Sequence, residues 1–255
     1  TVNAEFLTLL DDLRRVSGEP SPDGRLVREL SPDGTECRIV LSNATSAELD
    51  GLISAEQARA TEAGYTLEWK TYGHDTPAEL PARLLAAGFD PDDEERVLVL
   101  PVTDETIASF GNSPHEIRRV DDAAGLADYA EIAREIGRRN HEEEKEKLAA
   151  ELRESPDDLS IYIAYVDGEP AASGRLYFTP GSPAAELAGG RTRTTLRRHG
   201  LFTALVASRL REAQSRARTH VFVDALPTSE PTLTKRGFQF VTTTTPYVYE
   251  PNDSP

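Results

Sequence analysis

The pattern of hydrophobic and polar residues divides the chain into helical and extended segments. Apolar residues at helical spacing, such as Phe6, Leu10 and Leu13, predict helices, and alternating or continuous apolar runs predict strands. Up to residue 102 the expected elements are a helix at 3–16, strands at 25–30 and 36–41, a helix at 46–63, a strand at 66–72, a helix at 77–87 and a strand at 97–102.

A linker-like stretch follows, and a second series of elements comes after it. Residues 109–114, Ser-Phe-Gly-Asn-Ser-Pro, are typical of a connection between domains, so we expect domains at 1–110 and 114–255. In the second domain we expect a strand at 116–120, helices at 123–139 and 141–152, strands at 161–166, 171–178 and 185–192, a helix at 200–217, a strand at 221–225, a helix at 230–236 and closing strands at 238–248.

Composition narrows the classes of function. The 255 residues include 28 basic and 44 acidic ones, a formal net charge of −16, which argues against nucleic-acid or anionic-membrane partners. No apolar run approaches the roughly 20 residues of a membrane span. The first residues, Thr1 to Glu5, lack a basic-then-apolar signal pattern, and the lone Cys37 cannot form an internal disulfide. We therefore expect a cytoplasmic protein.

Positive charge is concentrated in one region of this acidic chain. Residues 1–113 carry nine basic and 22 acidic residues, whereas residues 189–218 carry eight arginines and a single acid, Glu212. Because the fields of like charges add, this arginine island could hold an anionic ligand. The alternative is a solvated arginine-rich helix face.

The island contains a strand, a short loop and the start of a helix at Gly200. The unpaired amides at a helix start bind phosphate groups well, and glycine lets the backbone approach an anion closely. Arg197, Arg198 and His199 would add charge-assisted donors. This arrangement predicts a phosphate or pyrophosphate site.

The segment Arg197-Arg198-His199-Gly200-Leu201-Phe202 resembles the Q/R-x-x-G-x-G/A loop of the GNAT superfamily of acyl-CoA-dependent N-acyltransferases. The order of elements over about residues 114–249 is also similar to that family. The resemblance implies an α/β (α+β) fold, with a GNAT-like mixed, mostly antiparallel sheet flanked by helices and a second, smaller α/β domain at the N-terminus. Phe202 departs from the pattern, because Gly or Ala usually stands there.

The first domain is interpreted as a degenerate copy of the second. Residues 47–102 run helix, strand, helix ending in Gly-Phe, and strand, as residues 201–248 do, but without the Arg-x-x-Gly loop. Two unrelated α/β segments could give the same order.

The resemblance also implies a binding site for acetyl-CoA as co-substrate. The loop amides would cradle its pyrophosphate, and the end of the preceding strand would pair with the pantetheine arm and donate an N–H to the thioester carbonyl. The implied cofactor-binding residues are Thr192, Arg193, Arg197, Arg198, His199, Gly200, Leu201, Phe202, Thr203 and Ser229. Ser229 could instead simply cap the helix that follows it.

Catalytic residues are less well defined by the sequence. At the position where many family members have a tyrosine as general acid, this chain has Leu233. Tyr247 is the candidate replacement and Glu186 a candidate proton relay, as Asp224 also could be. Their alternative roles are a sheet residue and outward-facing strand carboxylates. We expect no metal site, because the glutamates after His141 fan around a helix rather than converge.

The sequence therefore predicts an N-acetyltransferase that transfers an acetyl group from CoA to a primary amine, on a small molecule or a peptide, by direct attack. A second hypothesis is a non-catalytic acyl-CoA-binding or interaction module of the same fold, and a third is a nucleotide-phosphate binder. The chain could form a homodimer, and the sequence leaves its oligomeric state open.

Overall fold

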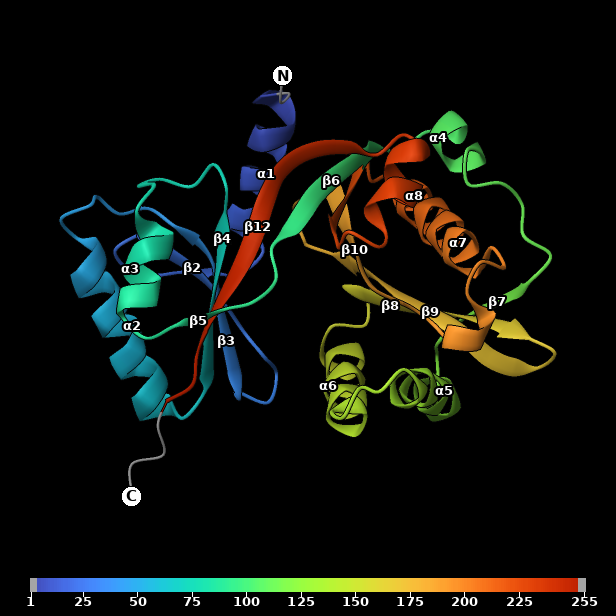
Figure 1. Cartoon of the computed structure of the whole chain (residues 1–255), viewed down its shortest axis with the longest axis horizontal. Coiled ribbons are helices and arrows are strands. Elements are labelled where there is room, and N and C mark those ends of the chain that lie inside the picture. Colours follow the sequence, from blue (N-terminus) through green and yellow to red (C-terminus); the bar gives the residue numbers. More distant parts are fainter. Residues whose placement is uncertain (1–3, 252–255) are drawn as a thin grey trace. The chain divides into compact units, whose positions relative to one another are not determined.

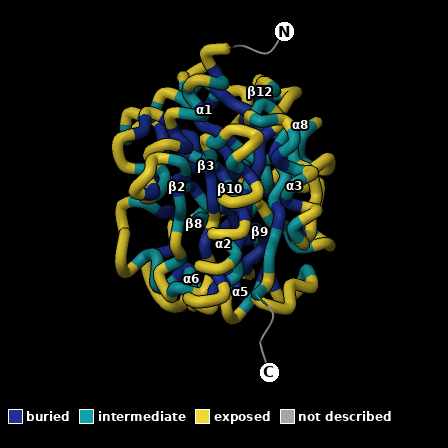
Figure 2. Tube along the Cα trace, turned by 90° about the vertical axis from the view of Figure 1, so that its left-hand side faces the viewer, coloured by how far each residue is buried: buried dark blue, intermediate teal, exposed yellow. Residues whose placement is uncertain are grey.

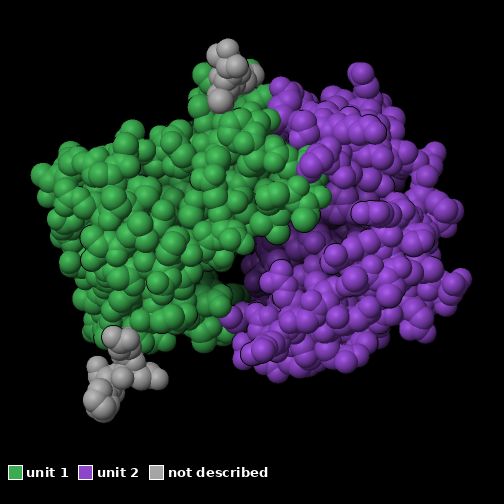
Figure 3. Space-filling model, viewed as in Figure 1, with its two compact units in different colours: residues 1–98, 224–230, 240–255 green, residues 99–223, 231–239 purple. Residues whose placement is uncertain are grey.

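The computed structural model describes residues 4–251. These residues form two compact units (Figure 3). Unit 1 comprises residues up to 98, residues 224–230 and residues from 240, and unit 2 comprises residues 99–223 and 231–239. The sequence predicts two related domains, 1–110 and 114–255, each continuous in sequence. That division stays a prediction.

Unit 1 contains a small sheet with helices formed by the first part of the chain. Its elements are α1 (Ala4–Val16), β1 (Glu19–Pro20), β2 (Leu26–Leu30), β3 (Glu36–Ser42), α2 (Leu49–Ala63), β4 (Thr66–Tyr72), α3 (Leu80–Ala86), β5 (Asp90–Pro91), the first part of β6 (Glu95–Pro101), and most of β12 (Gln239–Tyr249). The strand order is β1-β2-β3-β4-β12, and β5 also pairs with β12. Strands β3 and β4 are parallel, whereas β12 runs antiparallel to β4.

The core of unit 1 follows the alternation of the strands. Leu67 and Trp69 on β4 are buried and pack with Ile39 of β3 and Ile53 of α2. Tyr247 of β12, opposite Trp69 in the register, belongs to the same cluster. The closing strand of the sequence therefore completes the core of unit 1.

Unit 2 contains the remaining elements. They are α4 (Asp104–Ala108), β7 (Glu116–Arg119), α5 (Ala123–Glu135), α6 (His141–Glu154), β8 (Leu159–Val166), β9 (Glu169–Phe178), β10 (Ala184–Thr192), a 3₁₀ turn (Thr194–Leu196), α7 (Leu201–Ser215), most of β11 (His220–Ala225) and most of α8 (Glu230–Lys235). The strand order β11-β10-β9-β8-β7 is antiparallel except for the parallel pair β10 and β11.

Helices cover both faces of the strands of unit 2 (Figure 1). Helices α5 and α6 pack on one face, where Tyr129 and Leu148 meet Ile161 and Ile163 of β8. Helix α7 packs on the other face through Leu201 and Leu205. The strands hold most of the buried positions and the turns are exposed (Figure 2).

The predicted fold class is confirmed: the sheet is mixed, mostly antiparallel and flanked by helices. The predicted helices and strands occur with small shifts of their ends, whereas β1, β5, α4 and the 3₁₀ turn were not predicted. These four elements are at most five residues long, too short for a period to appear in the sequence. The segment at 238–248, predicted as more than one strand, forms β12 alone.

Within the described part of the chain, no helix combines the length and the apolar character needed to cross a membrane.

Candidate functional site

Strands β10 and β11 of unit 2 separate before β10 ends. Their parallel pairing stops at Leu187 opposite Val223, whereas β10 extends to Thr192. Over the same stretch the register of β10 against β9 shifts between Ala188 and Arg191. The last part of β10 therefore has a backbone edge that β11 does not pair with, and an extended ligand could add hydrogen bonds there.

Thr192 and Arg193, at the end of β10, differ in the direction of their backbone amides. The Arg193 amide donates to the carbonyl of Ala171 at 2.9 Å, so it is used in pairing with β9. Successive amides of a strand point to opposite edges, and the Thr192 amide therefore points away from β9. Of the two residues predicted to meet the pantetheine arm, only Thr192 has its amide at the uncovered edge. The Arg193 side chain pairs with Glu131 and Glu135.

The loop between β10 and α7 has an unusual backbone. Arg198 (φ 68°) and Gly200 (φ 79°) both adopt the left-handed conformation, which is costly for an arginine. The carbonyl of His199 accepts a hydrogen bond of 2.8 Å from Nε2 of His115. This contact fixes the loop against the segment that leads into β7.

The start of α7 is open. The first backbone hydrogen bond of the helix runs from Ala204 to Gly200 at 3.0 Å, and Gly200 provides no side-chain cap. The amides before that bond have no acceptor within the helix; they belong to Leu201, Phe202 and Thr203. A Cβ at Gly200 would meet no atom within 4 Å, so the space beside the loop is free. These features fit a bound phosphate group.

The arginines of the island differ in whether they form ion pairs with carboxylates. Arg191, Arg193 and Arg216 form ion pairs within unit 2. Arg197 and Arg198 are exposed, and neither pairs with a carboxylate of residues 4–251. Free positive charge therefore lies in the loop beside the open helix end, and also at the exposed Arg211 of α7, which forms no ion pair with a carboxylate of residues 4–251.

Phe202 is the departure from the family pattern, and its ring lies against β10. A Cβ added to Gly190 would lie 3.3 Å from Cε2 of Phe202. The half-buried ring therefore lies close to the strand segment that the pantetheine arm is predicted to follow.

The other predicted residues occupy different parts of the fold. Leu233 on α8 is fully buried. Ser229 lies in unit 1, and its hydroxyl donates to the carbonyl of Leu226. Tyr247 also lies in unit 1, in the hydrophobic core, where burial raises the pKa of its hydroxyl, as does the nearby charge of Glu94. Packing in that core accounts for Tyr247 without a catalytic role.

Glu186 lies on β10 and shares a face of the sheet with Tyr177 of β9. The two residues are direct partners in the register, and partners in an antiparallel pair point to the same side. Tyr177 packs against the cluster beneath α5 and α6. Glu186 is therefore a half-buried carboxylate on the α5–α6 face, just before β10 and β11 separate.

A polar cluster on that face was not predicted from the sequence. Arg191 forms a bidentate pair with Glu144 at 2.7 and 2.8 Å, and Arg175 donates to the hydroxyl of Tyr177 at 2.8 Å. Burial raises the pKa of Tyr177 to about 12, so the hydroxyl is neutral. The sequence signal was an arginine and a tyrosine in an otherwise apolar strand, which also suits an exposed face.

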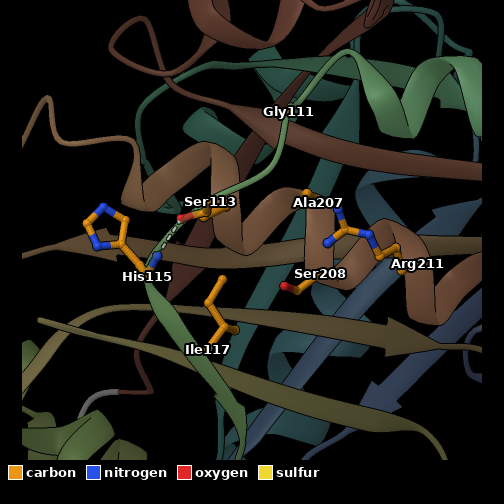
Figure 4. A pocket seen from close by; sticks show the side chains of 8 residues that line it. Gly111, Ser113, His115, Ile117, Ala207, Ser208 and Arg211 are labelled. Atoms are coloured by element: carbon orange, nitrogen blue, oxygen red, sulfur yellow. Dashed lines mark hydrogen bonds between the residues drawn. The ribbon is translucent and has the colours of Figure 1, made fainter. Parts of the chain in front are cut away.

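A small cavity of about 240 Å³ lies beside α7 (Figure 4). Ser208 and Arg211 of the helix lie across it from Ser113 and Ile117, whereas the ring of His115, at the edge of the cavity, points away from them. The His115 that lines this cavity also bonds the loop at His199, so the cavity and the loop share one support.

Comparison with known proteins identifies the class. Residues 126–238 match the model of the Acetyltransferase (GNAT) family. The chain therefore contains a GNAT acetyltransferase domain over these residues, which confirms the family that the sequence resembles. No curated protein matches the chain in sequence.

Solved structures share the fold of nearly the whole chain. A functionally unknown conserved protein from Staphylococcus epidermidis has a TM-score of 0.67 at 14% identity, covering 92% of this chain and 95% of its own. A GCN5-related N-acetyltransferase from Kribbella flavida has a TM-score of 0.64 at 14% identity, with coverages of 97% and 96%. A tandem GNAT protein from the clavulanic acid biosynthesis pathway has a TM-score of 0.63 at 15% identity, with coverages of 96% and 89%.

Proposed function

We propose that this chain transfers an acetyl group from acetyl-CoA to a primary amine by direct attack. The observation that carries the proposal is the open start of α7, flanked by the unpaired Arg197 and Arg198 and preceded by the uncovered edge of β10. The GNAT domain at residues 126–238 supports the same chemistry.

Acetyl-CoA would supply the activated acyl group. The amides of residues 201–203 and the side chains of Arg197 and Arg198 would bind its pyrophosphate. The Thr192 amide would donate to the thioester oxygen, where negative charge develops during acyl transfer. Phe202 narrows this path, so we expect its ring to move or to contact the pantetheine arm.

Proton transfer would involve a carboxylate. The attacking amine must lose a proton, and Glu186 on β10 is the proposed acceptor of that proton. Tyr247 as the proton donor to the leaving thiolate stays a sequence prediction, and Tyr247→Phe tests it. A rate within about threefold of wild type, less than 1 kcal/mol, would remove Tyr247 from the mechanism.

We also propose that residues 1–110 are a degenerate GNAT-like domain paired with the GNAT domain at 114–255. The parallel pair β3 and β4 joined by α2 repeats the parallel pair β10 and β11 joined by α7. The fold shared with a tandem GNAT protein over 96% of the chain supports this repeat.

The second candidate function is a non-catalytic acyl-CoA-binding module of the same fold. Buried Leu233 in place of the family's usual tyrosine, and the Phe202 ring against Gly190, favour it. Thermal stabilisation by acetyl-CoA without CoA release across a panel of amines would support the module over the enzyme. Absence of any stabilisation would contradict both.

The position of the CoA site is tested by Gly200→Glu. A carboxylate at Gly200 would stand where the pyrophosphate is proposed, and we expect loss of CoA binding by calorimetry with the far-ultraviolet dichroism retained. Gly200→Ala, which puts an uncharged side chain on the same left-handed backbone, is the matched control and should keep most of the CoA affinity. Unchanged affinity in Gly200→Glu would disprove the assignment.

A further inference from the structure

Arg175 is a half-buried cation on the α5–α6 face of unit 2, and it forms no ion pair with a carboxylate of the described residues, 4–251. Its Nη1 donates to the Tyr177 hydroxyl, but its Nε is buried and has no hydrogen-bond partner. A buried donor left without an acceptor costs about 1–3 kcal/mol. The hydroxyl of Ser173, two residues earlier on β9, is also buried and unpartnered.

The acidic residues nearby do not supply that partner. Glu144 is held in the bidentate pair with Arg191, so its charge is compensated. Glu144 and Glu151 act on Arg175 by Coulomb attraction, yet no carboxylate among residues 4–251 forms an ion pair with it. Burial lowers the pKa of Arg175, but Tyr177, Tyr129 and Glu144 outweigh this effect, and the guanidinium stays charged.

The guanidinium lies beside the shifted segment of β10. A Cβ added to Gly189 would be 2.5 Å from Nε of Arg175, and Gly189 has the left-handed φ of 62°. Only glycine admits the arginine so close to the strand. Arg175 is opposite Ala188 in the register, which makes Glu186 its diagonal neighbour on the same face, about 7–8 Å away between backbones.

We propose that Arg175, with Tyr177 beside it, binds a carboxylate carried by one of the two substrates. The inference rests on the proposed acyl transfer and names the class of substrate. A planar guanidinium suits a carboxylate because two parallel N–H bonds can form. Arg175 and Tyr177 are both half-buried, so a ligand can reach them.

The carboxylate has two chemical sources. On the acceptor, it would bind Arg175 while the amine of the same molecule lies near Glu186, as in an amino acid. On the acyl group, it would be the free end of a dicarboxylic acyl chain.

The experiment compares matched substrates in two arms. In the first arm, acetyl-CoA is offered to amino acids and to the corresponding carboxamides. In the second arm, succinyl-CoA and acetyl-CoA are compared with amines that carry no carboxylate. We expect kcat/KM to be at least about tenfold higher for the carboxylate form in one arm, and that arm identifies the source.

Variants separate a specific contact from a general effect. Arg175→Gln should reduce the preference below about twofold, and Arg175→Lys should restore part of it. Arg118→Gln, which removes an exposed charge from β7, is the control and should keep the preference. The proposal would be overturned if substrates with and without the carboxylate gave equal kcat/KM in both arms. It would also be overturned if Arg175→Gln kept the preference for the carboxylate form.

A binding measurement separates this inference from the proposed function. The same amino acids and free succinate are tested for thermal stabilisation of the wild-type chain and of Arg175→Gln without CoA. Stabilisation of the wild type alone would support the carboxylate site even if acetyl-CoA neither binds nor reacts, in which case only the acyl-transfer proposal fails. If acetyl-CoA reacts with carboxamides and amino acids equally and no carboxylate stabilises the chain, only the Arg175 proposal fails.

Discussion

At the residue scale, Phe202 and Gly190 determine how much space the proposed CoA site leaves for the pantetheine arm. The Phe202 ring lies against the backbone of β10 at Gly190, whereas the family pattern has Gly or Ala at position 202. We expect Phe202→Ala to tighten CoA binding by about threefold in calorimetry, a change of roughly 0.6 kcal/mol. The methyl group added by Gly190→Ala would lie 3.3 Å from the Phe202 ring. This crowding is absent when Phe202 is alanine, so the effects of the two substitutions on CoA affinity should not be additive. Weaker binding by Phe202→Ala would mean that the ring contacts the bound arm instead.

A second residue-scale effect is the protonation of Glu95 in unit 1. Burial and the charge of Asp224 raise the pKa of Glu95 to about 7, although Lys70 opposes this. Between about pH 4.5 and 7 the folded chain holds a proton that the unfolded chain has lost, so stability falls as pH rises through this window. Glu95→Gln should raise the melting temperature at pH 8 and have little effect at pH 5. An equal effect at both pH values would contradict this assignment.

At the scale of elements, α7 is locked to the sheet by a buried arginine. Arg209 is 2% exposed, and its guanidinium donates to the carbonyls of Arg175 and Ala188 at 2.9 and 3.2 Å. Burial, and then the charge of Arg175, lowers its pKa to about 10. Its contact with Ala188 holds β10 where the strand begins to diverge from β11. Gly174 leaves the necessary space, since a Cβ there would be 2.5 Å from the guanidinium carbon.

This lock predicts a measurable coupling. Gly174→Ala should lower the free energy of unfolding by about 1–3 kcal/mol, because the hydrogen-bonded guanidinium cannot move away freely. In an Arg209→Met background the same change should cost much less. Urea unfolding of the two single variants and the double variant measures the coupling. Additive effects would show that the two residues do not constrain each other.

The elements and the loop could be predicted from the sequence for physical reasons. Apolar periodicity is a local property, so α2, β4 and α7 are found within a few residues. The loop at 197–202 is also local, since the charge and the glycine are adjacent in sequence. The Arg175 cluster could not be predicted, because it depends on the register between β9 and β10 and on Glu144 engaging Arg191.

At the scale of the whole molecule, the net charge of −16 conceals how the arginines are used. Several arginines of the island form ion pairs with Glu131, Glu144 or Glu212, and only the structure separates them from Arg197 and Arg198. The partners of these arginines are glutamates of unit 2, and not the acidic residues that are in excess over residues 1–113.

The path of the chain leads to a prediction about folding in fragments. Strand β12 comes last in the sequence, yet it pairs with β4, and its Tyr247 packs in the core of unit 1. A fragment of residues 1–113 therefore lacks a strand and exposes the edge of β4. We expect this fragment alone to show no cooperative thermal unfolding. Coexpression with 114–255 should restore a folded complex that purifies together, whereas 114–238, which lacks β12, should not. Cooperative unfolding of 1–113 by itself would show that β12 is dispensable to unit 1.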